Sequence, residues 1–332
     1  MLLLQFLLMS IRSQLLHILS DRQIHSGVDL SQSLGVPVAA VRKQIRILRD
    51  YGIAIDAVPG HGYRLLESVV PLDKQIILGQ LGEIAPRLED RIEVLEEVGS
   101  TNTVLMSRPV NFESSGGVCL AEYQTAGRGR HGRGWVSSAY RNIMMSILWS
   151  FKQGPAALSG LSLAAGVAVV RALRQYGVNE VGIKWPNDVL WRGRKLSGIL
   201  LELCGEASGP TFAVVGLAVN VRVTPEDAAR LDQPWTDVET ITNRPVDRNR
   251  LAAQLIACLY DSFAAFGRTG IDSCREQWNK LHLYTGQQVS LCGGGQTING
   301  LALGADDSGA LLLKDDDGTV RRFYAGDVSL RR

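Results

Sequence analysis

The sequence has few cysteines, and none of them occurs in the Cys-x-x-Cys spacing that zinc and redox sites favour. Their number is odd and they are widely scattered: Cys119, Cys204, Cys258, Cys274 and Cys292. We therefore expect reduced, mostly buried thiols in a cytoplasmic protein, without a structural metal.

Strong charge and long apolar runs are also missing. The formal net charge is only +2, so any contact with nucleic acid must come from a local patch. Hydrophobic residues make up 45% of the chain, which is typical of a globular protein with two or three domains. The apolar start, residues 1–9, lacks basic residues and is too short to span a bilayer. We interpret it as an N-terminal extension, with Met9 as an alternative start, and expect no membrane span elsewhere.

Several catalytic signatures are absent as well. The sequence has neither the Gly-Lys-Ser/Thr of a Walker loop nor the His-Arg-Asp and Asp-Phe-Gly of a protein kinase. It shows no recognisable Ser-His-Asp or Cys-His arrangement for a covalent nucleophile. These absences exclude the common ATP-binding loops and favour a reaction without an enzyme-bound intermediate.

The beginning of the chain has the pattern of a winged helix-turn-helix. Helical periodicity from Ser10 to Asp21 is followed by a short predicted helix, 29–35, and a longer one, 38–51. Two predicted strands, 53–58 and 63–66, flank a Pro-Gly-His-Gly turn and would form the wing.

Basic residues of the longer helix favour DNA binding by this unit, because such a helix enters the major groove while basic groups contact phosphates. The residues expected to contact DNA are Arg42, Lys43, Arg46, Arg49 and, in the turn, His61. Charged faces also occur on purely structural helical units, so that alternative stays open.

Periodicity divides the chain into three predicted domains, at 10–68, 72–279 and 280–332. The second mixes strand-like runs such as 143–149 with helical runs such as 160–176, which predicts an α/β domain. After Gly286, four short strand-like runs alternate with hairpin turns at 293–295, 306–309 and 315–318. They predict a small SH3-like β-barrel.

A glycine-rich loop, Gly127-Arg-Gly-Arg-His-Gly132, is the first candidate for chemistry. It matches the glycine spacing of dinucleotide-binding folds, but turn and strand patterns follow it where those folds require a helix. Long arginine–glycine tracts bind RNA, whereas this loop is short and lies between predicted strands. Glycines let backbone amides approach an anion, and guanidinium groups match phosphate or carboxylate. We therefore predict anion capture in a folded site.

A second candidate is Lys184-Trp-Pro-Asn-Asp188, followed by Arg194-Lys-Leu-Ser-Gly198. Lys195 begins a buried-looking strand, which predicts that its ammonium faces a pocket. A surface hairpin with isolated charges is the structural alternative.

These motifs, together with Ser100-Thr-Asn102, Ala121-Glu-Tyr-Gln124 and Asn220, occur in the order found in biotin protein ligases. With the winged helix-turn-helix before them and the small barrel after them, the chain resembles the bifunctional ligases that also repress biotin operons. The resemblance covers residues 10–331 and implies an α+β multidomain protein. It implies a central domain similar to the catalytic fold of class II aminoacyl-tRNA synthetases. His131 departs from the family pattern, because an arginine is common there, and so does the apolar start of the recognition helix, residues 36–40.

The resemblance also implies roles for the matching residues. Lys195, Arg128 and Arg130 would be catalytic. Those implied to bind biotin are Ser100, Thr101, Asn102, Gln124, Arg128, Gly129, Arg130, Lys195 and Gly198. Those implied to bind the adenylate or ATP are Arg130, Arg133, Asp188, Asn220 and Trp235.

By the same resemblance, biotin and ATP with Mg²⁺ would form biotinyl-5'-AMP. Its biotin would pass to a lysine of the biotin carboxyl carrier protein of acetyl-CoA carboxylase. The glycine loop would order over the intermediate and exclude water. A homodimer, formed when the adenylate is bound, would bind operator DNA and repress biotin-synthesis genes. Two alternatives stay open: a ligand-sensing repressor without ligase activity, and a ligase for lipoate or a similar acyl group.

Overall fold

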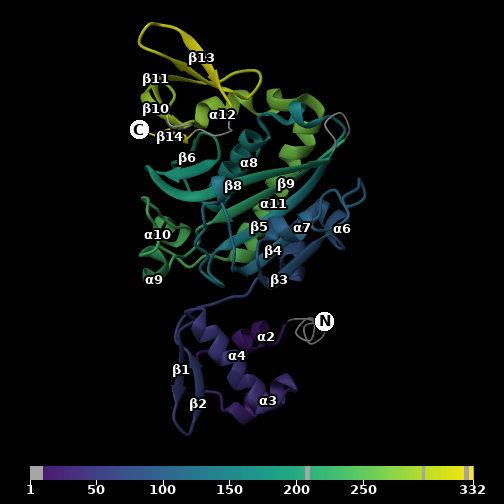
Figure 1. Cartoon of the computed structure of the whole chain (residues 1–332). Coiled ribbons are helices and arrows are strands. Elements are labelled where there is room, and N and C mark those ends of the chain that lie inside the picture. The colour runs from purple at the N-terminus through teal and green to yellow at the C-terminus, as the bar shows by residue number, and fades with distance from the viewer. Residues whose placement is uncertain (1–9, 206–209, 294–295, 325–328, 332) are drawn as a thin grey trace.

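The computed structural model describes residues 10–205, 210–293, 296–324 and 329–331, so the predicted extension at 1–9 lies outside the described residues. Three separate sheets follow one another along the chain, and Figure 1 shows the N-terminal unit at one end of an elongated molecule. The fold predicted from the sequence is confirmed: a helix-turn-helix unit, a central mixed sheet with helices, and a small antiparallel unit.

Within residues 10–65, the N-terminal unit contains three helices and a hairpin: α2 (Ile11–Leu19), α3 (Gly27–Leu34), α4 (Val38–Asp50), β1 (Ile55–Val58) and β2 (Gly62–Leu65). Its core is built from the periodic apolar residues, among them Leu16, Leu30 and Ile45. α3 begins two residues before the predicted start, because the Ser26 side chain caps it by accepting a hydrogen bond from the Asp29 amide, 3.0 Å away.

The central unit is built on a seven-stranded sheet in the order β3-β4-β5-β9-β8-β7-β6, in which only the β3–β4 pair is parallel. Its strands are β3 (Ile92–Val98), β4 (Val118–Gln124), β5 (Ile143–Phe151), β6 (Val181–Lys184), β7 (Asp188–Trp191), β8 (Arg194–Gly205) and β9 (Thr211–Val219). Its helices are α5 (Lys74–Gly79), α6 (Ala85–Leu88), α7 (Thr101–Met106), α8 (Leu161–Tyr176), α9 (Pro225–Ala228), α10 (Val238–Thr242), α11 (Arg248–Thr269) and α12 (Arg275–Leu281).

Successive side chains of a strand point to opposite faces, so the two faces of this sheet differ. One face packs against α8 and α11 and contributes most of the large core. The other face contacts the short helix α7, through a smaller cluster that includes Leu105, Leu148 and Val214. Because α7 is short, it covers only part of this face, and the rest has room for a site.

One helical segment, Pro155–Tyr176, is long and apolar enough to cross a membrane by length and composition, which the sequence analysis overlooked. Within the fold 67% of its most apolar window is buried, mainly because α8 packs against α11. Its apolar character is accounted for by this position in the core.

The C-terminal unit has five strands in the order β13-β12-β11-β10-β14, whereas four were predicted. They are β10 (Gln288–Gly293), β11 (Gln296–Ala305), β12 (Leu311–Lys314), β13 (Val320–Phe323) and β14 (Ser329–Arg331). The extra strand, β14, is only three residues long and pairs with β10, which is distant in sequence. The sequence around β14 therefore shows no alternation of polar and apolar residues from which a strand could be predicted. Part of the predicted turn at 293–295 lies outside the described residues.

A buried histidine stands where the central and C-terminal units join. The His282 ring stacks on Trp278, with 4.5 Å between ring centroids, and its Nδ1 lies 2.9 Å from the Thr285 hydroxyl. Its Nε2 is buried without a hydrogen-bond partner among the described residues. Burial lowers the pKa of His282 to about 4, because the charged ring would be desolvated.

Ion pairs and hydrogen bonds connect residues 67–70, the linker after the wing, to the central unit. Glu67 pairs with Arg141, whose side chain is 4% exposed, and with Arg222 at 3.1 Å. Arg248 pairs with Glu122 at 2.8 Å and donates to the carbonyl of Val70 at 2.7 Å. These contacts fix the linker on the central unit.

Candidate functional site

A cavity of about 680 Å³ lies in the central unit, on the face of the sheet that contacts α7. Its volume lies within the range of small-molecule binding sites. Every residue predicted to bind biotin or the adenylate lines it: Ser100, Thr101, Asn102, Gln124, Arg128, Gly129, Arg130, Arg133, Asp188, Lys195, Gly198, Asn220 and Trp235. The structure thus brings together residues from helix α7, several strands and several loops, which span 136 positions of the sequence, Ser100 to Trp235.

Uncharged polar groups form one end of the cavity. The Gln124 side-chain carbonyl accepts hydrogen bonds from the Thr101 amide at 2.7 Å and from the Thr101 hydroxyl at 3.1 Å. The Ser146 hydroxyl lies 2.6 Å from both Thr101 Oγ1 and Asn102 Oδ1. With its carbonyl fixed in this way, Gln124 retains its Nε2 amide as a donor for a ligand.

Asn102 belongs to the wall of this end. It is 2% exposed, and its Nδ2 donates to Glu202 at 2.6 Å and to the carbonyl of Leu200 at 3.4 Å. Its side chain lies directly over Gly216, where a Cβ atom would come within 2.2 Å of Asn102 Oδ1. A glycine at position 216 therefore makes room for Asn102.

The glycine loop folds back on itself as a small hairpin. The Gly129 amide donates to the carbonyl of Arg133 at 2.7 Å, and the Trp135 amide donates to the carbonyl of Gly127 at 2.8 Å. His131 sits at the tip with φ = 56°, a left-handed conformation. Backbone hydrogen bonds thus fix the shape of the loop, which lines the cavity, and further ordering on ligand binding stays a prediction.

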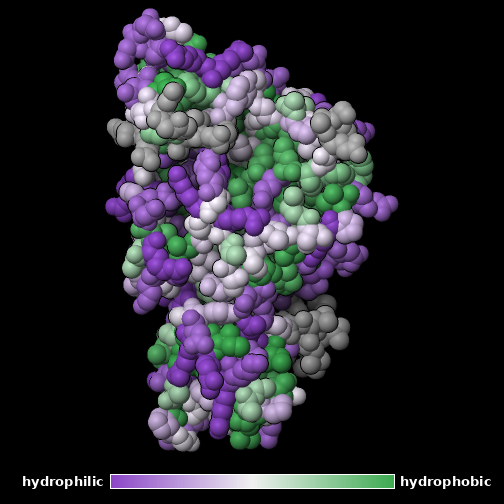
Figure 2. Space-filling view, viewed as in Figure 1, coloured by the Kyte–Doolittle hydropathy of each residue, from purple (hydrophilic) through white to green (hydrophobic). Residues whose placement is uncertain are grey.

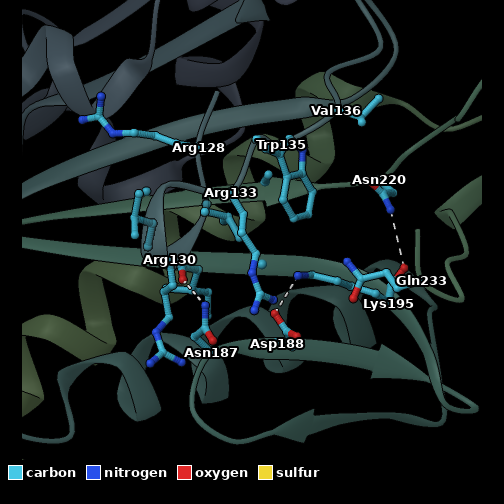
Figure 3. Close-up of a pocket in the computed structure, with 18 of the residues that line it drawn as sticks. Arg128, Arg130, Arg133, Trp135, Val136, Asn187, Asp188, Lys195, Asn220 and Gln233 are labelled. Carbon is cyan, nitrogen blue, oxygen red and sulfur yellow. Dashed lines mark hydrogen bonds and ion pairs between the residues drawn. The ribbon is translucent and has the colours of Figure 1, made fainter. Parts of the chain in front are cut away.

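The three arginines of the loop point in different directions (Figure 3). Arg130 and Arg133 extend toward Asn187 and Asp188, whereas Arg128 points away from Lys195. Arg128 instead pairs with Glu202, at 3.2 Å. Arg130 and Arg133 are therefore directed at the opposite end of the cavity from the uncharged polar groups. We call these two ends the cationic end and the neutral end.

Lys195 stands between the two ends. Its Nζ lies 2.9 Å from Asp188 Oδ1 and 5.2 Å from the centre of the Trp135 ring, as Figure 3 shows. Gly198 permits this arrangement, because a Cβ there would lie 2.8 Å from the Trp135 ring. An ion pair and a ring together hold the ammonium in place.

Positive charge dominates the lining of the cavity. Six lysines and arginines line it, against two aspartates: Arg128, Arg130, Arg133, Lys184, Lys195 and Arg230, with Asp188 and Asp232. At the cationic end the Asn220 Nδ2 donates to the carbonyl of Thr236 at 3.2 Å, and Trp235 pairs with Lys195 through an isolated bridge. Such a surface attracts anions.

The sequence did not predict several residues of the site or its supports, among them Trp135, Ser146 and Glu202. Trp135 lies three residues after the glycine loop. An aromatic residue this close to a predicted anion-binding loop was a signal in the sequence that could have identified it. Ser146 and Glu202 lie inside apolar strands, β5 and β8, behind the lining of the cavity. The pairing of those strands with β9 brings them into contact with the lining residues Asn102, Thr101 and Arg128. No group of three or more His, Cys, Asp or Glu side chains suited to a metal ion occurs among the described residues.

In the N-terminal unit, the residues predicted to contact DNA are exposed, but they differ in their hydrogen bonds within the chain. Arg42, Lys43 and Arg46 are exposed on α4, and Figure 2 shows a hydrophilic band over that part of the unit. The Arg49 Nε, by contrast, donates to the carbonyl of Ile55 at 2.8 Å and so holds the wing strand. The His61 Nδ1 lies 2.9 Å from the carbonyl of Pro59 at the exposed wing tip.

Comparisons with known proteins agree with this architecture. The model of the HTH domain matches residues 11–64, that of the Biotin/lipoate A/B protein ligase family matches 94–220, and that of the Biotin protein ligase C terminal domain matches 284–331.

Two curated proteins and a solved structure are similar over most of the chain. The bifunctional ligase/repressor BirA of Escherichia coli (strain K12) is 38% identical over 96% of this chain and 96% of its own. The biotin--[acetyl-CoA-carboxylase] ligase of Mycobacterium tuberculosis is 37% identical over 78% of this chain and 95% of its own. The biotin protein ligase from Aquifex aeolicus in complex with biotin and ATP aligns with a TM-score of 0.62 and 28% identity. It covers 73% of this chain and 99% of its own. With its helix-turn-helix unit, cationic cavity and C-terminal unit, the chain belongs to the family of bifunctional biotin protein ligases and repressors.

Proposed function

We propose that the chain joins biotin to AMP, using ATP, and then transfers biotin to a lysine of a carrier protein. The observation that carries the proposal is the position of Lys195, fixed between a neutral polar end and a cationic end of one cavity. Biotin has a neutral ureido ring and a carboxylate, and ATP is a polyanion. A cavity with these two ends accommodates both substrates with the reacting groups near Lys195.

The neutral end would hold the ureido ring. The Gln124 Nε2 amide is a donor suited to the ureido carbonyl, and Ser100 offers a hydroxyl group along the same wall. Thr101 would hold the Gln124 carbonyl in place beside the ring, because its amide and hydroxyl both donate to it. Asn102 would shape the wall rather than bind the ring, because protein groups already engage both of its side-chain polar atoms. This distribution of polar groups favours biotin over lipoate, whose dithiolane ring offers no such acceptor.

The cationic end would hold the triphosphate and the adenylate. Two anions repel each other, and Lys195 and Arg130, with Arg133 beside them, would offset that repulsion. Arg128, which pairs with Glu202, would act at the neutral end instead. A carboxylate oxygen of biotin then attacks the α-phosphorus, pyrophosphate leaves, and the mixed anhydride biotinyl-5'-AMP results. Trp235 would stack near the adenine, with Asn220 beside it. Mg²⁺ bound to the phosphates would neutralise charge on the leaving pyrophosphate.

In the second step, the amine of the acceptor lysine attacks the carbonyl carbon of the anhydride, and AMP leaves. No enzyme nucleophile is required, because AMP is already a good leaving group. The glycine loop would delay hydrolysis by excluding water until the acceptor docks. The acceptor we propose is the biotin carboxyl carrier protein of acetyl-CoA carboxylase, in the cytoplasm.

We also propose that the N-terminal unit binds operator DNA, with a homodimer of the adenylate-bound form contacting two half-sites. The exposed basic residues Arg42, Lys43 and Arg46 support this role. We propose that the chain has three domains, at 10–68, 72–279 and 280–332, so that each of the three sheets lies in its own domain.

Transfer to a carrier domain tests the ligase proposal. The purified chain is incubated with ATP, Mg²⁺ and a biotin carboxyl carrier domain, with biotin or lipoate as the acid, and the carrier is examined by mass spectrometry. Modification of one lysine by biotin is expected. Modification by lipoate alone would instead identify a lipoate ligase, and a chain that binds biotin without modifying the carrier would be a sensor only.

A further inference from the structure

Glu202 connects the wall of the neutral end to the glycine loop. One carboxylate oxygen, Oε2, accepts the hydrogen bond from Asn102 Nδ2 at 2.6 Å. The other, Oε1, lies 3.2 Å from the Arg128 guanidinium. A single side chain thus bridges α7, which bears the wall, and the loop that covers the cavity.

The strand register explains why Glu202 reaches both partners. Gly198 and Leu200 line the cavity from β8, and alternation along the strand puts Glu202 on the same face, two residues farther from Lys195. Leu200 pairs with Gly216, over which Asn102 lies. Glu202 is therefore at the outer edge of the neutral end, away from the reacting groups.

The two contacts of Glu202 differ in character. Asn102 is buried and held by a second bond from Ser146, so its contact with Glu202 is fixed. Arg128 and Glu202 have side chains that are 41% and 30% exposed, so water and salt weaken their attraction. The Glu202–Arg128 pair is thus the exchangeable part of the bridge.

We propose that Glu202 is a positioning residue that holds Arg128, and with it the glycine loop, across the opening of the neutral end. This inference rests on the proposed function in one respect, namely that the neutral end binds the ring of biotin. Glu202 then controls how long the ring is retained and does not take part in the attack on phosphorus. Its removal should affect the affinity for biotin and spare the rate at saturating biotin.

The variant Glu202→Gln tests this role, because its amide oxygen can still accept the bond from Asn102 while the charge that attracts Arg128 is lost. Biotin binding is measured calorimetrically without ATP, and the KM for biotin and kcat are measured by ATP–pyrophosphate exchange. We expect Kd and KM for biotin to rise about tenfold, with kcat within about twofold of the parent value. Glu83→Gln, which removes an exposed carboxylate outside the cavity lining, is the matched control and should leave all three values unchanged.

A double-mutant cycle with Arg128→Gln separates positioning from general damage. If the two residues act as a pair, the double variant should bind biotin no more weakly than Arg128→Gln alone. High salt should raise the Kd of the parent chain more than that of Glu202→Gln. Fully additive effects, or an unchanged Kd in Glu202→Gln, would overturn the inference while leaving the ligase activity intact. Absence of biotin binding by the parent chain would overturn the proposed function, and this inference with it.

Discussion

Lys195 and Asp188 form an ion pair of 2.9 Å between neighbouring strands, β8 and β7, at the boundary between the neutral and cationic ends of the cavity. Both side chains are less than a fifth exposed, and the Trp135 ring lies over the ammonium. An ammonium held in this way needs little reorganisation when charge develops on a substrate beside it. We regard it as the central element of the site.

Replacing Lys195 by Ala should lower the single-turnover rate of adenylate formation about a hundredfold or more, or roughly 3 kcal/mol, because a preorganised charge is lost. The measurement is rapid-quench detection of biotinyl-5'-AMP at saturating substrates. Lys152→Ala, which removes an exposed lysine outside the cavity lining, should retain the parent rate. A near-parent rate in Lys195→Ala would assign Lys195 a structural role only.

Gly198→Ala should impair the same step without changing any charge. The added methyl would lie 2.8 Å from the Trp135 ring, so the ring, which lies over the Lys195 ammonium, must move. A displacement of this size should cost roughly tenfold to a hundredfold in rate. Gly79→Ala adds a methyl group in open space and serves as the control. An equal rate for the two variants would show that the packing of Trp135 on Gly198 is not needed.

The stability of the chain should depend on pH through His282. An unfolded histidine titrates near pH 6.5, whereas burial lowers the pKa of His282 to about 4. Stability from this group is therefore present above pH 6.5 and is lost as pH falls toward 4, by roughly 3 kcal/mol at most. Urea unfolding of the parent and of His282→Gln, followed from pH 7 to pH 4, checks this. The difference in free energy of unfolding between the parent and His282→Gln should narrow with falling pH. A constant difference would contradict the lowered pKa of His282.

DNA binding should depend on Arg42 and Arg46 but much less on Arg49. Loss of an exposed phosphate contact should weaken binding to all sequences alike and reduce the salt dependence. Arg49 is committed to the carbonyl of Ile55, so Arg49→Ala should chiefly lower the thermal stability of the N-terminal unit. Fluorescence anisotropy with the region upstream of biotin-synthesis genes, with and without biotin and ATP, gives the affinities. No binding in either condition would leave the N-terminal unit a structural module.

Much of the site could be predicted because its motifs are local. The glycine loop, the segment 184–188 and Lys195 each lie within a few residues of their structural context, and all line the cavity. Glu202 and Ser146 could not be predicted, because their positions depend on the pairing of β8 and β5 with β9. The hydrogen bond from Arg49 to the carbonyl of Ile55 could not be predicted either, because helical periodicity describes exposure and not whether a backbone carbonyl lies within reach.

In the fold, too, the elements that could be predicted are those with a local sequence signal. Helices α2, α4, α8 and α11 follow their apolar periodicity closely, because each buries one continuous face. The strand β14 was missed because a three-residue strand has too little alternation to detect, and its pairing with β10 is long-range. Nonlocal pairing therefore limits prediction in both the fold and the site.

ATP–pyrophosphate exchange is the most direct test of the account, because it reports adenylation of the acid without a carrier protein. The purified chain is supplied with labelled pyrophosphate, ATP and Mg²⁺, with biotin, with lipoate or with neither. Exchange that requires biotin and is lost in Lys195→Ala is the predicted result. Exchange with lipoate but not biotin, or none with either acid, would contradict the account.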